Sequence, residues 1–393
     1  MTLDNETIVG SGEFNDELQQ MRQKKAQRTR KKVTIIAVIV AVAVAIALVA
    51  TFIQINRSYS SYTIISSESR GDEAGAKYTY YKDGYIRCSG GGVERVNIDG
   101  EKVWNTVHSM TNPSVKTRDD IICIADINGN AIEVFDENGM ISRVDTQFSI
   151  LQTEVSSSGL VAAVLQDNDD NYINMYDKVG GYIYSIKTSI RGEGYPLDIA
   201  ISDDGKKLAV SYVRAAGNLL ETGIRFYDFG SGDKDSAETG RFNNFDGKPV
   251  GVVEFFGNDM VVAVEGDSVT FYSAENSKEK KSIETEGTVN KVIFGDNKFA
   301  LIYSSGRICI YDPSGKIMSD IETDALYSDY HFYDNSIILE NVNSFAVMDI
   351  SGKFVTKQDT EIPVIELVPN GAKDRYFFIN ERFIQRIRLT CQS

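Results

Sequence analysis

Hydrophobic positions follow two different patterns along this chain of 393 residues. Residues 33–53 form an unbroken run of 21 residues without a charged side chain, whereas from about residue 77 short apolar segments alternate with polar positions and glycine-containing turns. At about 1.5 Å per residue, the unbroken run would cross the hydrocarbon core of a bilayer, which is about 30 Å thick. Its β-branched residues do not argue against a helix, because in lipid every backbone amide must be paired within the segment. The first pattern therefore predicts a transmembrane helix, and the second predicts many short strands.

Basic residues lie mostly on one side of the predicted helix. Residues 1–32 contain seven Lys and Arg side chains against five acidic ones, whereas Arg57 is the only basic residue close behind the run. The positive-inside rule predicts a single-pass protein of the cell membrane, with a cytoplasmic N-terminus and an extracellular part that begins near Gln54. A cleaved signal peptide is the alternative, with Ala45, Ala47 and Ala50 as candidate cleavage residues. Such peptides normally have a shorter apolar region of about 7–15 residues.

The second pattern repeats with a period near 40 residues. Each unit contains a strand that ends in an apolar or aromatic residue, followed by Asp and then by a turn with Gly. The interval of 84 residues between Asp228 and Asp312 hides a degenerate unit, because residues 270–273 fall at its middle. A period near 40 with four short strands per unit is typical of a propeller blade. The repeating aspartates are Asp99, Asp136, Asp177, Asp228, Asp312 and Asp349.

One unit, residues 195–243, shows all four strand signals. Apolar and polar positions alternate in residues 197–202, 207–213 and 223–228, and a short outer strand follows near residues 240–242. Since successive side chains of a strand point to opposite faces, the apolar face of each strand is expected to lie in the gap between blades.

The end of the chain suggests how the ring closes. Three strand signals, at residues 364–368, 375–380 and 383–389, belong to the last unit, which lacks a fourth. The missing strand could be residues 62–65, and this exchange would leave no open edge between the first and last blades. Counting the composite blade predicts an all-β, eight-bladed β-propeller preceded by one transmembrane α-helix. Seven blades is the alternative, if residues 77–83 do not form an inner strand.

Charge divides unevenly among the four parts that these patterns define. The net charge of the chain is −15, and the tail, residues 1–32, carries +2. The apolar run has no charge, so the exported part carries −17. This part repels phosphate backbones, which argues against nucleic acid, and its sign suits cations or a basic protein patch. The expected parts are a basic cytoplasmic tail at 1–32, the transmembrane helix at 33–53, a linker at 54–76 and the propeller at 77–391.

Four cysteines lie far apart, without C-x-x-C or zinc spacing. An exported chain could form disulfides. However, Cys88 and Cys123 are offset by one position when their units are aligned, which points their side chains to opposite strand faces. We therefore expect no disulfide among Cys88, Cys123, Cys309 and Cys391.

The sequence contains no recognisable catalytic constellation, and no catalytic residue, cofactor or cofactor-binding residue is predicted. Ser-His-Asp chemistry needs a histidine base, and the chain has only His108 and His331, which we interpret as structural or surface residues. Two carboxylates could meet in the central channel, as glycoside cleavage requires, but the sequence does not place such a pair in space.

The one metal candidate is a weak one for calcium. Asp167, Asp169 and Asn171 have a D-x-D-x-N spacing that could present oxygen ligands to this hard cation. The loop lacks Gly at its sixth position and has Lys178 at its twelfth, so it is not an EF-hand. We favour a solvated hairpin tip over a metal site.

Two segments resemble known propellers. Residues 96–104, Val-Asn-Ile-Asp-Gly-Glu-Lys-Val-Trp, resemble one blade of the quinoprotein-like propellers, and residues 201–210 are similar to a blade of periplasmic propellers. In quinone-dependent dehydrogenases the Trp recurs in most blades. This chain has a single Trp, so the resemblance supports the fold and not the cofactor.

A wider resemblance covers nearly the whole chain. The order of tail, apolar run, Trp104–Pro113 junction and Gly194–Gly205 segment resembles an uncharacterised family of single-pass, membrane-anchored β-propeller proteins, a domain of unknown function from clostridia-like Gram-positive bacteria. This resemblance implies a Gram-positive cell surface and offers no activity or site residues.

Together these features predict a binding or scaffolding module at the cell envelope, and not an enzyme. The expected partners are the membrane itself and an envelope protein or cell-surface ligand. One alternative is a transmembrane sensor that couples an extracellular ligand to residues 1–32. Another is a hydrolase or lyase that acts on cell-wall glycans, which would require a carboxylate pair along the channel.

Overall fold

The computed structural model describes residues 21–22, 25, 32, 34–47, 49, 57–71, 75–230, 237–242 and 249–391. The chain forms two compact units, residues 1–58 and residues 59–393. In the first unit, residues 34–47 are helical. Among the described residues, no helix is both long enough and apolar enough to cross a membrane. Most of the predicted tail, and residues 33, 48 and 50–53 of the predicted span, lie outside the described residues.

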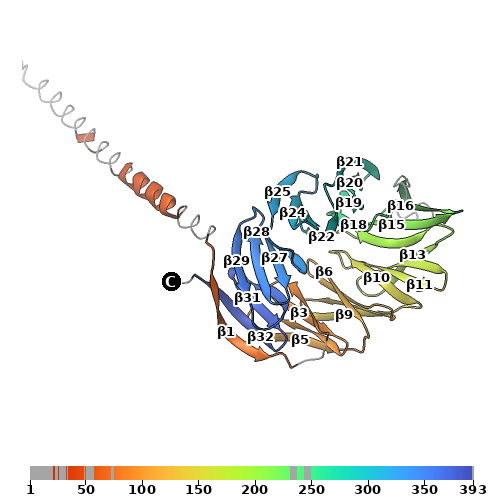
Figure 1. Ribbon diagram of the computed structural model, residues 1–393, viewed down its shortest axis with the longest axis horizontal. Helices are drawn as coiled ribbons and strands as arrows, with labels where there is room; N and C mark the ends of the chain where they lie inside the picture. The colour runs from red at the N-terminus through yellow and green to blue at the C-terminus, as the bar shows by residue number, and fades with distance from the viewer. Residues whose placement is uncertain are drawn as a thin grey trace, which may run out of the picture. The chain divides into compact units, whose positions relative to one another are not determined.

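The second unit consists of eight antiparallel, four-stranded sheets, which we number as blades 1 to 8. Figure 1 shows the first strands of blades, such as β6, β18 and β22, nearest the middle of the ring, and last strands, such as β21, β25 and β29, at its rim. Blade 1 contains β2 (Lys77–Tyr81), β3 (Gly84–Ser89), β4 (Gly92–Val96) and β5 (Lys102–Val107). Blade 2 contains β6 (Pro113–Arg118), β7 (Ile121–Asp126), β8 (Ala131–Asp136) and β9 (Gly139–Asp145). Blade 3 contains β10 (Ser149–Val155), β11 (Val161–Asp167), β12 (Asp170–Tyr176) and β13 (Tyr182–Ser189). Blade 4 contains β14 (Tyr195–Ile201), β15 (Lys207–Ala216), β16 (Leu219–Asp228) and β17 (Glu238–Phe242).

The remaining blades follow the same order. Blade 5 contains β18 (Val252–Phe256), β19 (Met260–Val264), β20 (Ser268–Ser273) and β21 (Lys278–Glu284). Blade 6 contains β22 (Val289–Gly295), β23 (Lys298–Tyr303), β24 (Arg307–Tyr311) and β25 (Ile317–Glu322). Blade 7 contains β26 (Asp329–Tyr333), β27 (Ser336–Asn341), β28 (Ser344–Asp349) and β29 (Phe354–Asp359). Blade 8 contains β30 (Val364–Asn370), β31 (Ala372–Asn380), β32 (Phe383–Thr390) and β1 (Ser61–Ser69).

Blade 8 closes the ring with strands from both ends of the propeller. Its order is β1-β32-β31-β30, and β1 pairs with β32 from Ser61 opposite Thr390 to Ser69 opposite Phe383. Because β2 pairs with β3 as a true inner strand of blade 1, the ring has eight blades, as the repeat predicted. The degenerate unit is blade 5, whose third strand β20 contains residues 270–273.

The repeating aspartate stabilises the turn between the third and fourth strands. In blade 6, Asp312 Oδ1 accepts hydrogen bonds from the backbone N–H groups of Ser314 and Lys316, at 2.9 and 3.0 Å. Gly315 follows with a φ of 74°, a conformation that favours glycine. In blade 1 the same two bonds are accepted by Asn97 Oδ1, from Asp99 and Glu101. The alignment that placed Asp99 in this position was therefore wrong by two residues.

The hydrophobic core lies in the gaps between neighbouring blades. Trp104 of blade 1 stacks on Phe135 of blade 2, with ring centroids 5.2 Å apart, and its indole N–H donates to the backbone oxygen of Glu137 at 3.1 Å. Cys88 and Cys123 are free thiols in different inter-blade clusters, which separates their sulfur atoms as the strand offset predicted. Cys309 is also free and buried, and Cys391 is exposed.

Candidate functional site

The first strands of neighbouring blades approach one another around the central channel, and several ionisable side chains pair there. These strands carry charged residues at positions that alternate with core residues. In β26, for example, Asp329 and His331 flank the buried Tyr330. Alternation within a strand sends neighbouring side chains to opposite faces, so one face packs between blades while the other supplies polar groups. Paired acidic and basic side chains therefore line the central channel.

A cavity of about 390 Å³ opens at the ends of the inner strands of blades 1 to 6. Aromatic rings and charged groups share its wall, and four carboxylates face two cationic side chains. The aromatic residues are Tyr80, Tyr81, Phe255, Phe256 and Phe294, and the charged residues are Lys82, Arg118, Asp119, Asp203, Glu254 and Asp296.

Arg118 connects three blades at this cavity. It lies at the end of β6 in blade 2, and its Nε donates to Asp203 Oδ1, at 3.0 Å, in blade 4. Its Nη1 donates to Glu254 Oε1, and its Nη2 to the backbone oxygen of Phe255, both at 3.1 Å in blade 5. The guanidinium has a planar fork of donors, so it holds these groups in one fixed arrangement.

Deeper in the channel, a second group of charges continues from the Arg118 contacts. Lys116 Nζ lies 2.5 Å from Glu154 Oε1, and Gln152 Nε2 donates to Asp198 Oδ1 at 2.5 Å. Burial raises the pKa of Glu154 despite the neighbouring Lys116. Burial, together with the charge of Glu154, raises the pKa of Glu254 to about 7. Glu154 and Glu254 thus retain their protons at higher pH than an exposed glutamate would.

A third group lies between blades 7 and 8, and we call His331, Glu340 and Glu366 the His331 cluster. The histidine Nε2 lies 3.8 Å from Glu340 Oε2 and 3.6 Å from Glu366 Oε1. Asp329 Oδ2 is 3.5 Å from the same nitrogen, and Asp329 also pairs with Lys291 of blade 6. Strands β26, β27 and β30 supply the three members of the cluster.

The carboxyl groups of the His331 cluster have shifted protonation. Burial, followed by repulsion from Glu366, raises the pKa of Glu340 to about 8. Burial likewise raises the pKa of Glu366 to about 7. Burial alone would lower the pKa of His331, but Asp329 and Glu366 raise it. The pKa of Asp329 is held below its usual value, against burial, by His331 and Lys291.

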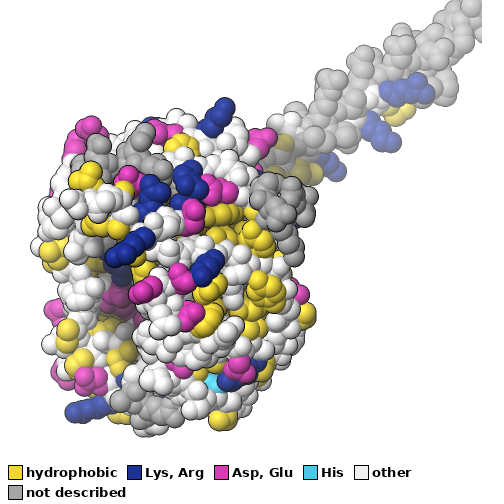
Figure 2. All heavy atoms as spheres, turned by 90° about the vertical axis from the view of Figure 1, so that its right-hand side faces the viewer, with side chains coloured by type: hydrophobic (Ala, Val, Ile, Leu, Met, Phe, Trp, Pro, Cys, Tyr) yellow, Lys and Arg dark blue, Asp and Glu magenta, His cyan; other side chains and the backbone are white. Residues whose placement is uncertain are grey.

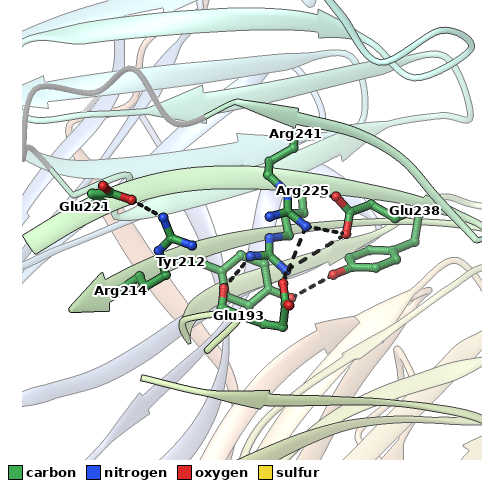
Figure 3. A network of polar contacts seen from close by, with 8 residues as sticks. Glu193, Tyr212, Arg214, Glu221, Arg225, Glu238 and Arg241 are labelled. Carbon is green, nitrogen blue, oxygen red and sulfur yellow. Dashed lines mark hydrogen bonds and ion pairs between the residues drawn. The ribbon is translucent and has the colours of Figure 1, made fainter. Parts of the chain in front are cut away.

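A further ionic network lies on blade 4 and has a structural character (Figure 3). Arg225 of β16 is buried and donates to the backbone oxygen of Glu193 at 2.6 Å, while it also pairs with the carboxylate of Glu193. Its guanidinium lies over the ring of Tyr212, 4.9 Å from the centroid. Arg241 reaches Glu238 at 2.9 Å. These contacts fasten the loop before β14 to the outer strands of its blade.

The outer surface in Figure 2 carries acidic and basic side chains interspersed with apolar ones. On this face no single sign of charge dominates. Buried carboxyl groups with raised pKa values, such as Glu254 and Glu340, lie in the channel instead.

The sequence candidates lie elsewhere. Asp167, Asp169 and Asn171 are at the β11–β12 hairpin, where Asn168 adopts a φ of 50° and Asn171 is buried. Asp167 Oδ1 accepts a hydrogen bond from Asn168 Nδ2. His108 is buried in a connector, with Nδ1 2.9 Å from Glu133 Oε2.

Sequence reasoning missed Glu340 and Glu366, and it interpreted His331 as a structural or surface residue. One signal could have found Glu340, since it is an acidic residue directly after three apolar residues in the second strand of its blade. The proximity of Glu366 depends on how blade 8 packs against blade 7, which no local pattern shows.

The fold and the channel define a single-ring, eight-bladed β-propeller with a charged central channel. Residues 55–389 match DUF5711, a family of unknown function, so the chain belongs to this family. No curated protein matches the sequence.

Solved structures confirm the architecture. The chain is similar to BamB from Moraxella catarrhalis, with 12% identity and a TM-score of 0.53, over 84% of this chain and 100% of that one. It is similar to apo AztD from Citrobacter koseri, with 13% identity and a TM-score of 0.52, over 75% and 88% of the two chains. The computationally designed Ika8 protein gives 12% identity and a TM-score of 0.55, over 81% and 98%. At this identity the likenesses show the fold alone.

Proposed function

We propose that this protein is a membrane-anchored binding or scaffolding module whose propeller faces the outside of the cell. Support for the anchor comes from the uncharged residues 33–53 and from the excess of basic residues before them. The resemblance to membrane-anchored propellers suggests the envelope of a clostridia-like Gram-positive bacterium as the location. Propellers host many functions, so the ligand must be argued from the site itself.

The observation that carries the proposal is the cavity at the channel mouth. Its four carboxylates outnumber its two cationic groups, and the part of the chain after residue 53 has a net charge of −17. Aromatic rings beside carboxylates suit a Lys or Arg side chain, which gains both ion pairing and a cation–π contact. We therefore propose that the propeller binds a basic segment of an envelope protein at this mouth.

Site-specific photo-cross-linking in intact cells tests this proposal. A photoreactive residue would replace Asp296, which is exposed at the cavity, and in a matched control it would replace Asp169, which is exposed at the β11–β12 hairpin. We expect a reproducible envelope protein from position 296 and not from position 169. The yield should fall several-fold in an Asp119→Asn variant and with added salt. Equal capture from both positions, or no reproducible partner, would contradict the proposal.

A second candidate function rests on the channel carboxyl groups. Glu154 and Glu254 both have raised pKa values in the channel, and a proton donor beside a carboxylate is what glycoside cleavage uses. A cell-wall glycan hydrolase or lyase would lose its activity in Glu254→Gln while the fold is kept. The test is the release of soluble fragments from purified cell-wall glycan. If the unaltered protein releases none, this candidate is removed.

A further inference from the structure

Three strands of two blades bring a histidine and two glutamates to one point of the channel wall. His331 lies on β26, Glu340 on β27 and Glu366 on β30. One ligand atom from each residue lies within 4.8 Å of the others. Among the described residues, this is the one group of His, Cys, Asp or Glu side chains with spacing that suits a metal ion.

The histidine nitrogen at the centre of this group lacks a hydrogen bond. Nε2 of His331 is buried, and in the described part of the chain it has no hydrogen-bond partner. Its distances of 3.5 Å to Asp329 Oδ2, 3.6 Å to Glu366 Oε1 and 3.8 Å to Glu340 Oε2 all exceed the usual range of hydrogen bonds. Two ligands bound at about 2.1 Å to one tetrahedral ion lie about 3.4 Å apart. The observed separations are therefore close to those of co-ligands.

Surrounding contacts orient Glu340 and the neighbouring Asp329 from outside the cluster. Glu340 Oε1 accepts a hydrogen bond from the backbone N–H of Leu367, which leaves Oε2 directed to the cluster. Asp329 Oδ1 accepts from the N–H of Tyr330 at 2.7 Å and pairs with Lys291. Contacts of this kind around the ligands fix their orientation and tune metal affinity.

We propose that His331 Nε2, Glu340 Oε2 and Glu366 Oε1 bind a divalent first-row transition ion such as Zn²⁺. An imidazole nitrogen suits this class of ion, whereas Ca²⁺ and Mg²⁺ prefer sites made of oxygen alone. Two carboxylates balance the charge of the ion. Three protein ligands leave a coordination position for water or for a group that enters the channel. The site does not depend on the proposed binding of a basic segment.

Zinc titration of the full chain, purified in mild detergent and stripped with a chelator, tests the site. Competition with a chromogenic chelator should give one zinc equivalent for the unaltered protein. Glu366→Gln and His331→Gln should each weaken binding at least tenfold. Glu254→Gln is the matched control, because it removes a channel carboxylate from a different group of charges and should keep the full affinity.

Two further measurements separate a specific site from loose association. Zinc bound only by the native state should raise the melting temperature of the unaltered protein and of Glu254→Gln, but not that of Glu366→Gln. Cobalt substituted for zinc should give visible absorption that is lost in the same variant. Circular dichroism checks each fold. If His331→Gln does not fold, the result for Glu366→Gln tests the site. This variant should fold, because the Glu366 side chain is 23% exposed and is the less buried of the two glutamates.

Two results would contradict the metal site. If the unaltered protein binds no more zinc than Glu366→Gln, or if Glu254→Gln loses as much affinity, the metal site is wrong. The cluster would then be a protonated histidine held among carboxylates.

Discussion

Arg118 of blade 2 donates a hydrogen bond to Glu254 of blade 5, with 3.1 Å between Nη1 and Oε1. The two residues are 136 positions apart in the sequence. The same guanidinium binds Asp203 of blade 4, so one side chain connects blades that are not neighbours in the ring. This contact shapes the wall of the cavity at the channel mouth, and it makes the stability of the ring sensitive to a single charge.

Replacing Arg118 should destabilise the protein. Arg118→Met keeps much of the aliphatic stem but leaves Glu254 and Asp203 without their cation. We expect a loss of about 1–3 kcal/mol in the free energy of unfolding, because a partly buried carboxylate then lacks its partner. Denaturant unfolding of the full chain measures this loss. The double variant Arg118→Met, Glu254→Gln should recover part of it, and simple additivity of the two single losses would contradict the coupling.

Glu254 should make stability depend on pH. Its pKa is raised from 4.5 to about 7 in the folded protein, mainly by burial. Between these values the folded state binds more protons than the unfolded state, so this group lowers stability as the pH rises from about 4.5 to about 7. Glu254→Gln removes the group.

Melting temperatures across this pH range check that prediction. The melting temperature of Glu254→Gln should rise relative to that of the unaltered protein as the pH rises. A difference between the two melting temperatures that stays constant with pH would contradict this prediction. Glu284→Gln, at an exposed position on β21, provides a control for loss of one carboxylate at the surface.

His108 should also lower stability as the pH rises, but over a higher pH range. Burial alone would lower its pKa, but Cys88 and Glu133 raise it to about 10, well above the ordinary value of 6.5. The folded state therefore holds the proton more strongly. The stabilisation is fully present below about pH 6.5 and is lost as the pH rises to about 10. His108→Gln should lower the free energy of unfolding most at low pH, by about 1–3 kcal/mol, and progressively less toward pH 10. Denaturant unfolding at several pH values measures the difference, and a larger cost at high pH would refute the assignment.

The anchor makes a separate prediction. If residues 33–53 span the membrane, the full chain should remain in the membrane pellet after washing at alkaline pH, and a variant without these residues should not. Protease added to intact cells from which the wall has been removed should digest the propeller and spare a tag placed before residue 1. Digestion of the tag with the propeller protected would reverse the orientation.

The sequence by itself determined the fold, because propeller blades are local units. Four strands and their turns lie within about 40 residues, and each turn carries its own signal, such as the Asp312 side chain that binds the N–H of Ser314. The same locality explains the error at Asp99. Asn97 makes equivalent hydrogen bonds, so an alignment by residue type selected the wrong position.

Only the tertiary structure decided the site. Arg118 meets Glu254, and His331 meets Glu340 and Glu366, because the ring brings separate blades to a common axis. Those distances depend on the packing of blade against blade and on closure by β1, and neither leaves a pattern within one repeat. The local sequence around a charged residue on an inner strand is the same whether the side chain faces solvent or a partner across the channel. Strand alternation fixes the direction of a side chain, and only the assembled ring fixes what it meets.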